Sequence, residues 1–168
     1  AVLLVISPKG REFAVAGLAD LKLRDAVKEN TRFYIASSGK LMTSAVIFQL
    51  EQEGKLSLPA KAANLMAPFP GLGRIDHIKS VTVEQLLKHR SGLAEYYGDE
   101  FEKAASKDPS KRWNVEESLK FIFDEKANDQ PGRAYEYVNT NYVLLGHLIA
   151  SLDRGTYENS LKGRLFEH

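Results

Sequence analysis

The chain has 168 residues, of which 43% are hydrophobic and 27% are charged. This composition is typical of a globular domain with a core of its own, so it excludes disordered, fibrous and repetitive proteins. The 23 basic and 22 acidic residues give a net charge of +1, no run of like charges occurs, and cysteine is absent. We therefore expect no nucleic-acid partner, no disulfide and no thiolate chemistry.

The N-terminal segment predicts a β-hairpin. Two apolar runs, AVLLVIS and REFAVAG, flank a turn in which Pro8 and Gly10 stand where a tight turn accepts them. The first run is apolar at every position, which predicts a strand covered on both faces by helices. It is too short to span a membrane, so no membrane span is expected.

A helix is predicted from Ser37 to Glu53. Leu41, Ala45, Phe48 and Gln52 fall on one stripe at helical spacing, and Ile47 and Leu50 widen the apolar face. Gly54 follows and ends the helix as a C-terminal cap. The polar segment 18–32 before the helix is interpreted as a connection.

Three more helices are expected further along the chain. Thr82 and Gln85 form a capping box that opens a short helix, which Gly92 closes. Asn114 and Glu117 form a second capping box, which opens the helix VEESLKFIFDEK. The last helix, NYVLLGHLIASL, is apolar on several sides and is expected to be buried. Residues 55–80 contain several prolines and glycines and are expected to be mostly loop.

The four histidines do not indicate a metal site. None stands in the spacing H-E-x-x-H, and no serine stands in G-x-S-x-G, so neither a zinc peptidase nor an α/β-hydrolase is indicated. We expect no metal and no cofactor. His89, near a helix end, and His147, in the buried helix, are interpreted as structural. Tyr96 and Tyr97 are interpreted as partly buried surface aromatics that could line a cleft.

The segment FYIASSGKLMTS contains a candidate nucleophile. Residues three apart lie on one face of a helix and residues two apart do not, so Ser37 can contact Lys40 and Ser38 cannot. A serine hydroxyl becomes nucleophilic when a neighbouring group accepts its proton, and a lysine kept partly neutral can do so. The alternative is that Ser37 caps the helix and Lys40 is an ordinary solvated residue.

A second polar cluster precedes the last helix. The segment PGRAYEYVNTNYVLLG carries Tyr137 and Asn139 at the expected helix N-terminus. A tyrosine acts as an acid or base when cations lower its pKa, and an asparagine can both donate to and accept from a substrate amide. A second Y-x-N, Tyr157 to Asn159, lies in a polar segment and is interpreted as a solvated surface pair.

The chain resembles the class C serine β-lactamase family in the order and spacing of four segments. These are the hairpin, FYIASSGKLMTSAVIFQLEQEGKLSL, VTVEQLLKHRSGL and PGRAYEYVNTNYVLLGHLI. That family includes D-alanyl-D-alanine carboxypeptidases, D-aminopeptidases and esterases. The resemblance implies that Ser37 is the acylated nucleophile and Lys40 its proton partner. It also implies that Tyr137 is the general base or proton relay and that Asn139 holds the substrate amide.

The resemblance also implies a fold. This is an α/β (α+β) architecture, β-lactamase/transpeptidase-like, in which an antiparallel sheet is flanked by helices beside a mainly helical region. Residues 1–58 would carry the hairpin and the nucleophile helix, 59–138 the helical and loop region, and 139–168 the helix that returns to the sheet. Substrates would be β-lactams, D-alanyl peptides or esters, and a periplasmic or secreted location is implied by the family alone.

The sequence departs from the family in two respects. Val138 stands where serine or alanine is usual, and Gly39 is atypical. The third family motif, K-[ST]-G or H-x-G on a late strand, is not found, because the RSG of Arg90 to Gly92 follows a helix. We expect the domain to be partial, with a second chain supplying the remaining strands and that motif. The alternatives are a non-catalytic binding member of the family and an inactive fragment.

Overall fold

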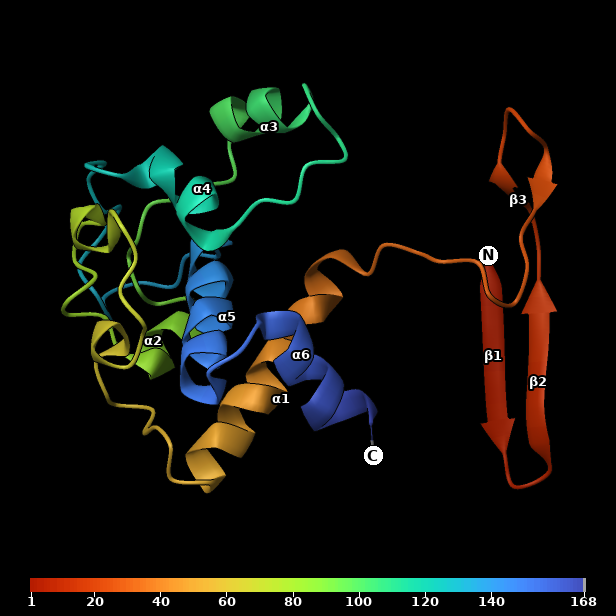
Figure 1. Cartoon of the computed structure of the whole chain (residues 1–168), viewed down its shortest axis with the longest axis horizontal. Coiled ribbons are helices and arrows are strands. Elements are labelled where there is room, and N and C mark those ends of the chain that lie inside the picture. Colours follow the sequence, from red (N-terminus) through yellow and green to blue (C-terminus); the bar gives the residue numbers. More distant parts are fainter. Residues whose placement is uncertain (168) are drawn as a thin grey trace. The chain divides into compact units, whose positions relative to one another are not determined.

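The computed structural model describes residues 1–167, and His168 lies outside the described residues. Contacts divide the chain into two units, Ala1–Ala36 and Ser37–His168. The first unit consists of strands and the second of helices and loops (Figure 1). The division into residues 1–58, 59–138 and 139–168 has other boundaries and stays a prediction.

The predicted hairpin is confirmed in the first unit. Strands β1 (Val2–Ser7) and β2 (Gly10–Val15) pair antiparallel, and Ser7 faces Gly10 beside the turn. Gly10 has a φ of 131°, a conformation that glycine adopts without steric cost.

A second small hairpin occupies the segment that was interpreted as a connection. Strands β3 (Leu18–Asp20) and β4 (Asp25–Ala26) pair antiparallel. The carboxylate of Asp20 accepts hydrogen bonds from the backbone N–H groups of Lys22 and Leu23, at 2.7 and 2.8 Å. Aspartate closes turns in this way, so the polar composition of the segment reflects its turn.

The prediction that the first strand is covered on both faces is wrong within the unit that contains it. Five of the six residues of β1 are exposed, and all six residues of β2 are exposed. A pair of two-stranded ribbons provides no second layer, so the apolar faces have nothing in this unit to pack against.

The second unit is a cluster of helices joined by long loops. In Figure 1 α1 and α5 lie side by side, with α6 next to them and α2 on the other side of α5. No helix within residues 1–167 has the length and hydropathy needed to cross a bilayer. The α-helices are α1 (Gly39–Gln52), α2 (Val83–Leu87), α3 (Asp99–Ala105), α4 (Val115–Leu119), α5 (Thr140–Asp153) and α6 (Tyr157–Leu161). Short turns are η1 (Ala36–Ser38), η2 (Ala62–Asn64), η3 (Leu72–Arg74), η4 (Lys120–Ile122) and the π-helical η5 (Lys162–Phe166).

The core lies where α1 meets α5, and within the predicted apolar face of α1 it is Ile47 and Leu50 that are buried. Leu41 and Phe48, on the predicted stripe, are 77% and 48% exposed. The buried residues of α1 are Thr43, Val46, Ile47 and Leu50. This helix carries apolar residues on two sides, and the positions of α5 and α6 decide which side is buried. In the core the α1 residues are joined by Leu86, Leu144, Leu145, Leu148 and Ile149.

Both capping boxes are confirmed. The Thr82 hydroxyl accepts from the N–H of Gln85 at 3.1 Å, and the Gln85 side chain accepts from the N–H of Thr82 at 2.9 Å. Asn114 and Glu117 exchange the equivalent bonds at 2.8 and 3.2 Å. The two pairs satisfy N–H groups that the first helical turn leaves without a partner.

Two helix ends differ from the prediction. The helix opened by Thr82 ends at Leu87, and His89, with a φ of 51°, takes the left-handed conformation already before Gly92. The helix VEESLKFIFDEK stops at Leu119 and continues only as the short turn η4. Its last residues are diverted because Asp124, with a φ of 62°, forms an ion pair with Arg74 on another loop.

Gly92 and Gly54 provide a matched pair for testing how tightly the loops pack. Both have a φ near 70°, but a Cβ atom on Gly92 would lie 2.1 Å from the carbonyl oxygen of Asp129, whereas one on Gly54 would meet nothing within 4 Å. We expect Gly92→Ala to lower the free energy of unfolding by about 3 kcal/mol, since it adds a backbone clash to left-handed strain. Gly54→Ala should cost about 1 kcal/mol. Equal losses in urea denaturation would contradict this packing.

An ion cluster ties the end of the chain to α1 and α5. The guanidinium of Arg164 donates to Asp153 at 2.6 and 2.7 Å and to Glu53 at 2.6 and 3.1 Å. The hydrogen bond from Arg164, with a second from Lys55, lowers the pKa of Glu53 to about 2. The pKa of Asp153 is also lowered, again chiefly by Arg164.

This cluster predicts a pH dependence of stability. A carboxylate whose pKa is lowered by folding stabilises the folded state fully above its ordinary pKa, and the contribution is lost as the pH falls through the folded value. Arg164→Met should therefore lower the urea midpoint at pH 7, and the difference from the parent should shrink as the pH falls from about 4.5 towards about 2. Arg133→Met, which removes an exposed pair with Asp129, is the control and should change little. A pH-independent effect of Arg164→Met would contradict the assignment.

Candidate active site

Ser37 and Lys40 meet at the start of α1. Ser37 lies in the turn η1, and the ammonium of Lys40 donates to its Oγ at 3.2 Å. Ser38 is the N-cap of α1 and makes no side-chain capping bond. Ala36, immediately before, has a φ of 45°, an uncommon conformation for a residue with a side chain. The i,i+3 contact that was predicted for Ser37 is therefore present.

Tyr137 lies against the same serine although it is 100 residues away. Its hydroxyl donates to Ser37 Oγ at 2.8 Å, and the Lys40 ammonium lies 4.9 Å from the centre of its ring. The pKa of Tyr137 is lowered, first by the interaction with Lys40 and second by the hydrogen bond with Ser37. A phenol with a lowered pKa can exchange a proton with a serine hydroxyl at a lower pH than an isolated tyrosine.

Asn139 completes the cluster from the N-terminus of α5. Its Oδ1 accepts from the Lys40 ammonium at 2.8 Å. Val138, which stands between Tyr137 and Asn139, is 3% exposed and points into the interior. Along this segment a site residue, a core residue and a second site residue therefore follow one another. The valine that departs from the family pattern is therefore a packing residue. All four predicted site residues, Ser37, Lys40, Tyr137 and Asn139, are brought together.

His89 is a neighbour of the site that sequence analysis interpreted only as structural. Its buried ring stacks on Tyr137 with centroids 4.4 Å apart and on Tyr142 at 5.1 Å. Its Nδ1 accepts from the N–H of Val138 at 3.3 Å and lies 3.2 Å from the Asn141 amide nitrogen. Burial, and secondarily the charge of Lys40, lowers the pKa of His89. A neutral ring that accepts at Nδ1 fixes the path of the chain through Tyr137.

Glu95 is a second residue that sequence analysis missed. It lies in the loop after α2, and its carboxylate accepts from both the backbone N–H and the side-chain amide of Asn139, at 2.5 and 3.1 Å. No motif marks this position, and only its proximity to Asn139 in space reveals it.

Tyr157 contradicts the interpretation of the second Y-x-N as a solvated surface pair. Its hydroxyl lies 2.6 Å from the hydroxyl of Thr43, and its ring packs against Gly146 of α5. Asn159 is exposed, as predicted. The half-buried ring of Tyr157 thus joins α6 to α1 and α5.

Tyr96, Tyr97 and His147 agree with the structural roles that were predicted for them. Tyr97 is 48% exposed, and Tyr96 packs edge-on against Phe101 at 5.0 Å. Burial is the main cause that raises the pKa of Tyr96. His147 lies 2.7 Å from the carbonyl oxygen of Ala67 through Nε2 and joins a loop to α5.

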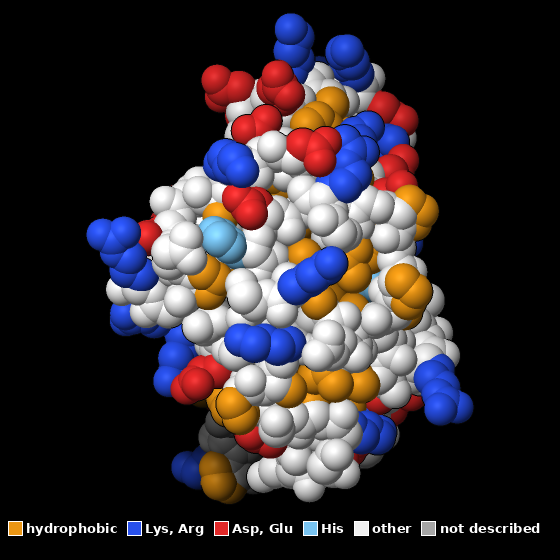
Figure 2. Space-filling model, turned by 90° about the vertical axis from the view of Figure 1, so that its left-hand side faces the viewer, with side chains coloured by type: hydrophobic (Ala, Val, Ile, Leu, Met, Phe, Trp, Pro, Cys, Tyr) orange, Lys and Arg blue, Asp and Glu red, His pale blue; other side chains and the backbone are white. Residues whose placement is uncertain are grey.

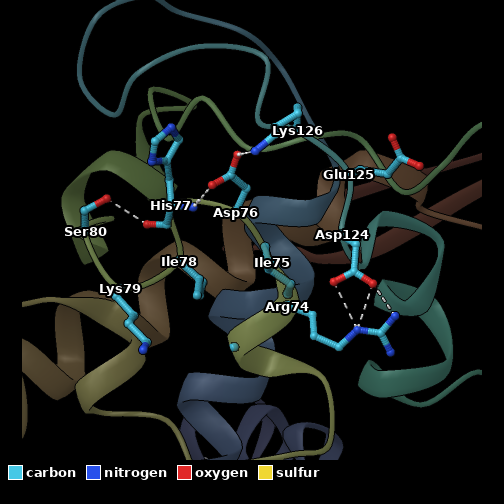
Figure 3. Close-up of a pocket in the computed structure, with 11 residues that line it drawn as sticks. Arg74, Ile75, Asp76, His77, Ile78, Lys79, Ser80, Asp124, Glu125 and Lys126 are labelled. Atoms are coloured by element: carbon cyan, nitrogen blue, oxygen red, sulfur yellow. Dashed lines mark hydrogen bonds and ion pairs between the residues drawn. The ribbon is translucent and has the colours of Figure 1, made fainter.

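A large open hollow lies elsewhere in the helical unit, and none of the four predicted residues lines it. Its volume is about 680 Å³, and its walls are residues 73–80 and 124–126. Figure 3 shows that its charges are largely paired: Arg74 with Asp124, and Asp76 with Lys126 and with the N–H of His77. These pairs hold two loops together. Within residues 1–167 no group of three or more His, Asp or Glu side chains is placed to hold a metal ion.

The surface of the helical unit mixes charges of both signs. On the face shown in Figure 2, basic and acidic side chains are interspersed, and small hydrophobic patches lie between them.

Comparison with known proteins identifies the family of the chain. The family described as Beta-lactamase matches residues 1–168. The chain belongs to the beta-lactamase family. This confirms the recognised resemblance, and the antiparallel strands and helices have the β-lactamase/transpeptidase-like fold that the resemblance implied.

Individual members of the family are similar over nearly the whole chain. Penicillin-binding protein 4* of Bacillus subtilis is 30% identical over 152 residues, which is 89% of this chain and 32% of that protein. A penicillin-binding protein from Bacillus halodurans is 27% identical with a TM-score of 0.79, covering 99% of this chain and 48% of that one. A D-amino acid amidase from Ochrobactrum anthropi SV3 is 25% identical with a TM-score of 0.79, covering 99% and 43%. The chain thus spans about a third of this curated relative and under half of these two solved structures.

The cluster predicts that Lys40 and Tyr137 act as one unit. In the full gene product, Lys40→Ala and Tyr137→Phe should each lower the rate of acylation by about 10²–10⁴-fold. The double variant should be little slower than either single one, because the two groups serve the same proton transfer. Stopped-flow acylation with a chromogenic cephalosporin measures this.

Tyr135→Phe is the matched control. Tyr135 is 65% exposed and lies edge-on to His89 without contacting Ser37. Its loss should leave acylation within about twofold, since substitutions of exposed side chains usually have small effects. If Tyr137→Phe behaves like Tyr135→Phe, Tyr137 is a packing residue.

Proposed function

We propose that this chain carries the acyl-transfer residues of a serine hydrolase, with Ser37 as nucleophile. The observation that carries the proposal is the contact of Ser37 Oγ with both Lys40 and Tyr137, at 3.2 and 2.8 Å. A serine that only caps a helix needs neither of these partners. Membership of the beta-lactamase family supports the same chemistry.

The proposed reaction starts with proton transfer from Ser37. Tyr137 as phenolate, held in that form by Lys40, takes the proton while Oγ attacks the carbonyl carbon of the substrate. The C–N or C–O bond then breaks, and the leaving amine or alcohol receives the proton from Tyr137. Water later attacks the acyl-enzyme ester while Tyr137 accepts a proton from it. The bond between the acyl carbon and Oγ then breaks, the carboxylic acid leaves, and Tyr137 returns the proton to Oγ, which restores Ser37. The lowered pKa of Tyr137 supports its role as the base.

Asn139 is proposed to bind the substrate amide. Its Oδ1 already accepts from Lys40 and its Nδ2 donates to Glu95. A carboxamide has two lone pairs and two N–H groups, so one acceptor site and one donor remain for a ligand. The backbone N–H of Ser37, at the first helical turn, is proposed as one oxyanion donor.

The proposed substrates are β-lactams, D-alanyl peptides or related amides and esters. The similar proteins include penicillin-binding proteins and a D-amino acid amidase, one structure of which contains L-phenylalanine. β-Lactams, peptides, amides and esters all offer an acyl carbonyl to a serine. A second chain that supplies further strands and the third motif remains part of the proposal.

A non-catalytic binding protein is the alternative from another functional class. It would use the same site for peptide ligands without forming a covalent bond. The joint contact of Lys40 and Tyr137 with Ser37 favours the enzyme, because binding alone needs no proton transfer. Covalent labelling separates the two functions.

We expect a fluorescent penicillin or a fluorophosphonate to label Ser37 of the full gene product. Peptide mapping by mass spectrometry should place the label on Ser37, because this serine contacts Lys40. Ser37→Ala should abolish labelling, and Ser38→Ala, the adjacent control, should retain it. Label on Ser38, or label that survives Ser37→Ala, would refute the nucleophile. Reversible binding of a penicillin without label would favour the binding protein.

A further inference from the structure

We propose that Glu95 is a positioning residue of the Ser37 site: its carboxylate orients Asn139, and through Asn139 it holds Lys40 where Lys40 reaches Ser37. This inference deepens the proposed function and rests on it. Glu95 contacts neither Ser37 nor Lys40 through any recorded hydrogen bond among the described residues. Its action would therefore pass through Asn139.

The carboxylate of Glu95 accepts three N–H groups at once. Oε2 accepts from the backbone N–H of Asn139 at 2.5 Å and from its Nδ2 at 3.1 Å, and Oε1 accepts from the N–H of Tyr97 at 2.8 Å. A carboxylate has only acceptor oxygens and suits three donors, whereas the amide of a glutamine would have to present its own N–H groups to one of them. Binding these three N–H groups therefore depends on both the charge and the shape of the Glu95 carboxylate.

The bond from Nδ2 to Glu95 decides which way the Asn139 amide points. With Nδ2 directed to the carboxylate, Oδ1 is directed to the Lys40 ammonium, from which it accepts at 2.8 Å. A flipped amide would place Nδ2 against the ammonium and Oδ1 against the carboxylate. A donor would then face a donor, and an acceptor would face an acceptor. Glu95 and Lys40 thus select the same orientation from opposite ends.

The loop that carries Glu95 is fastened to the same helix end. The hydroxyl of Thr140 donates to the carbonyl of Ala94 at 2.7 Å and accepts from the N–H of Tyr96 at 3.1 Å. Thr140 is fully buried and is the first residue of α5. Because the backbone on both sides of Glu95 is held, its carboxylate needs little ordering to meet Asn139.

Glu95 also balances the charge of Lys40. The charged groups that act on Tyr137 are Lys40 and Glu95, while Ser37 is hydrogen-bonded to it and the neutral ring of His89 is stacked on it. Lys40 lowers the pKa of Tyr137 and Glu95 raises it. If Glu95 holds Lys40 in place, its loss should release Lys40 and raise the pKa of Tyr137, because Lys40 is the main cause that lowers this pKa. Loss of the negative charge alone would lower the pKa of Tyr137 further, so the direction of the change separates positioning from a purely electrostatic effect.

The test compares Glu95→Gln with the parent in the full gene product. We expect penicillin acylation to fall by about 10–100-fold, the range that follows from misplacing catalytic groups by about 1 Å. We also expect the pKa of Tyr137, followed by NMR in protein with ¹³C-labelled tyrosine and assigned with Tyr137→Phe, to rise, because Lys40 would no longer be held beside the phenol. The NMR measurement requires no activity. If the parent is not acylated at Ser37, the proposed function fails, and the titration still decides the role of Glu95.

Three further variants make the outcome decisive. Glu95→Asp keeps the charge and both acceptors, so it should restore the Tyr137 pKa and part of the acylation rate. In an Asn139→Ala background Glu95→Gln should cost less than threefold, since its effect passes through Asn139. Glu100→Gln removes an exposed carboxylate of α3 and should change neither measurement.

An unchanged rate in Glu95→Gln, a Tyr137 pKa that stays the same or falls, or full additivity with Asn139→Ala would overturn the proposal. The proposal would also be overturned if Glu95→Gln unfolds while Glu95→Asp keeps the parent's stability, acylation rate and Tyr137 pKa. Glu95 would then serve only to anchor its loop.

Discussion

The packing of α1 against α5 is the constraint on which the candidate site depends. Val46, Ile47 and Leu50 of α1 are fully buried in one core with Leu144, Leu145 and Leu148 of α5. This apolar contact fixes the distance between the two helix N-termini, where the polar residues lie. Lys40 and Asn139, 99 residues apart in the chain, are hydrogen-bonded at 2.8 Å as a consequence. Burial of the aliphatic side chains is the force that holds these polar groups in place.

The site is held by a shell of side chains that do not react. His89 stacks on Tyr137 and accepts from the backbone of Val138, and Glu95 accepts from Asn139. Both residues lie on the segment that follows α2, so this short helix and its loop form one wall of the site. A catalytic group whose rotamer is fixed by neighbours needs no reordering during reaction, which is the general advantage of a prearranged site.

Local signals in the sequence predicted local structure well. Turn residues located the first hairpin, and the two capping boxes opened helices where Thr82 and Asn114 placed them. Predictions failed where a distant contact competed with a local preference. The helix after Asn114 ends early where Asp124 pairs with Arg74, and Tyr157 is half-buried because its hydroxyl meets Thr43. Such contacts join residues 50 and 114 positions apart.

By itself, the sequence determined the contact of Ser37 with Lys40, because helix geometry alone places residues three apart on one face. The order and spacing of its motifs also determined the family. Only the tertiary structure decided that the Thr43–Leu50 face of α1 is buried while Leu41 and Phe48 are exposed. It alone brought His89 and Glu95 to the site, since no periodicity or motif marks either residue. The physical reason is that local spacing acts within one helical turn, whereas the choice of buried face and of distant partners follows from how whole helices pack.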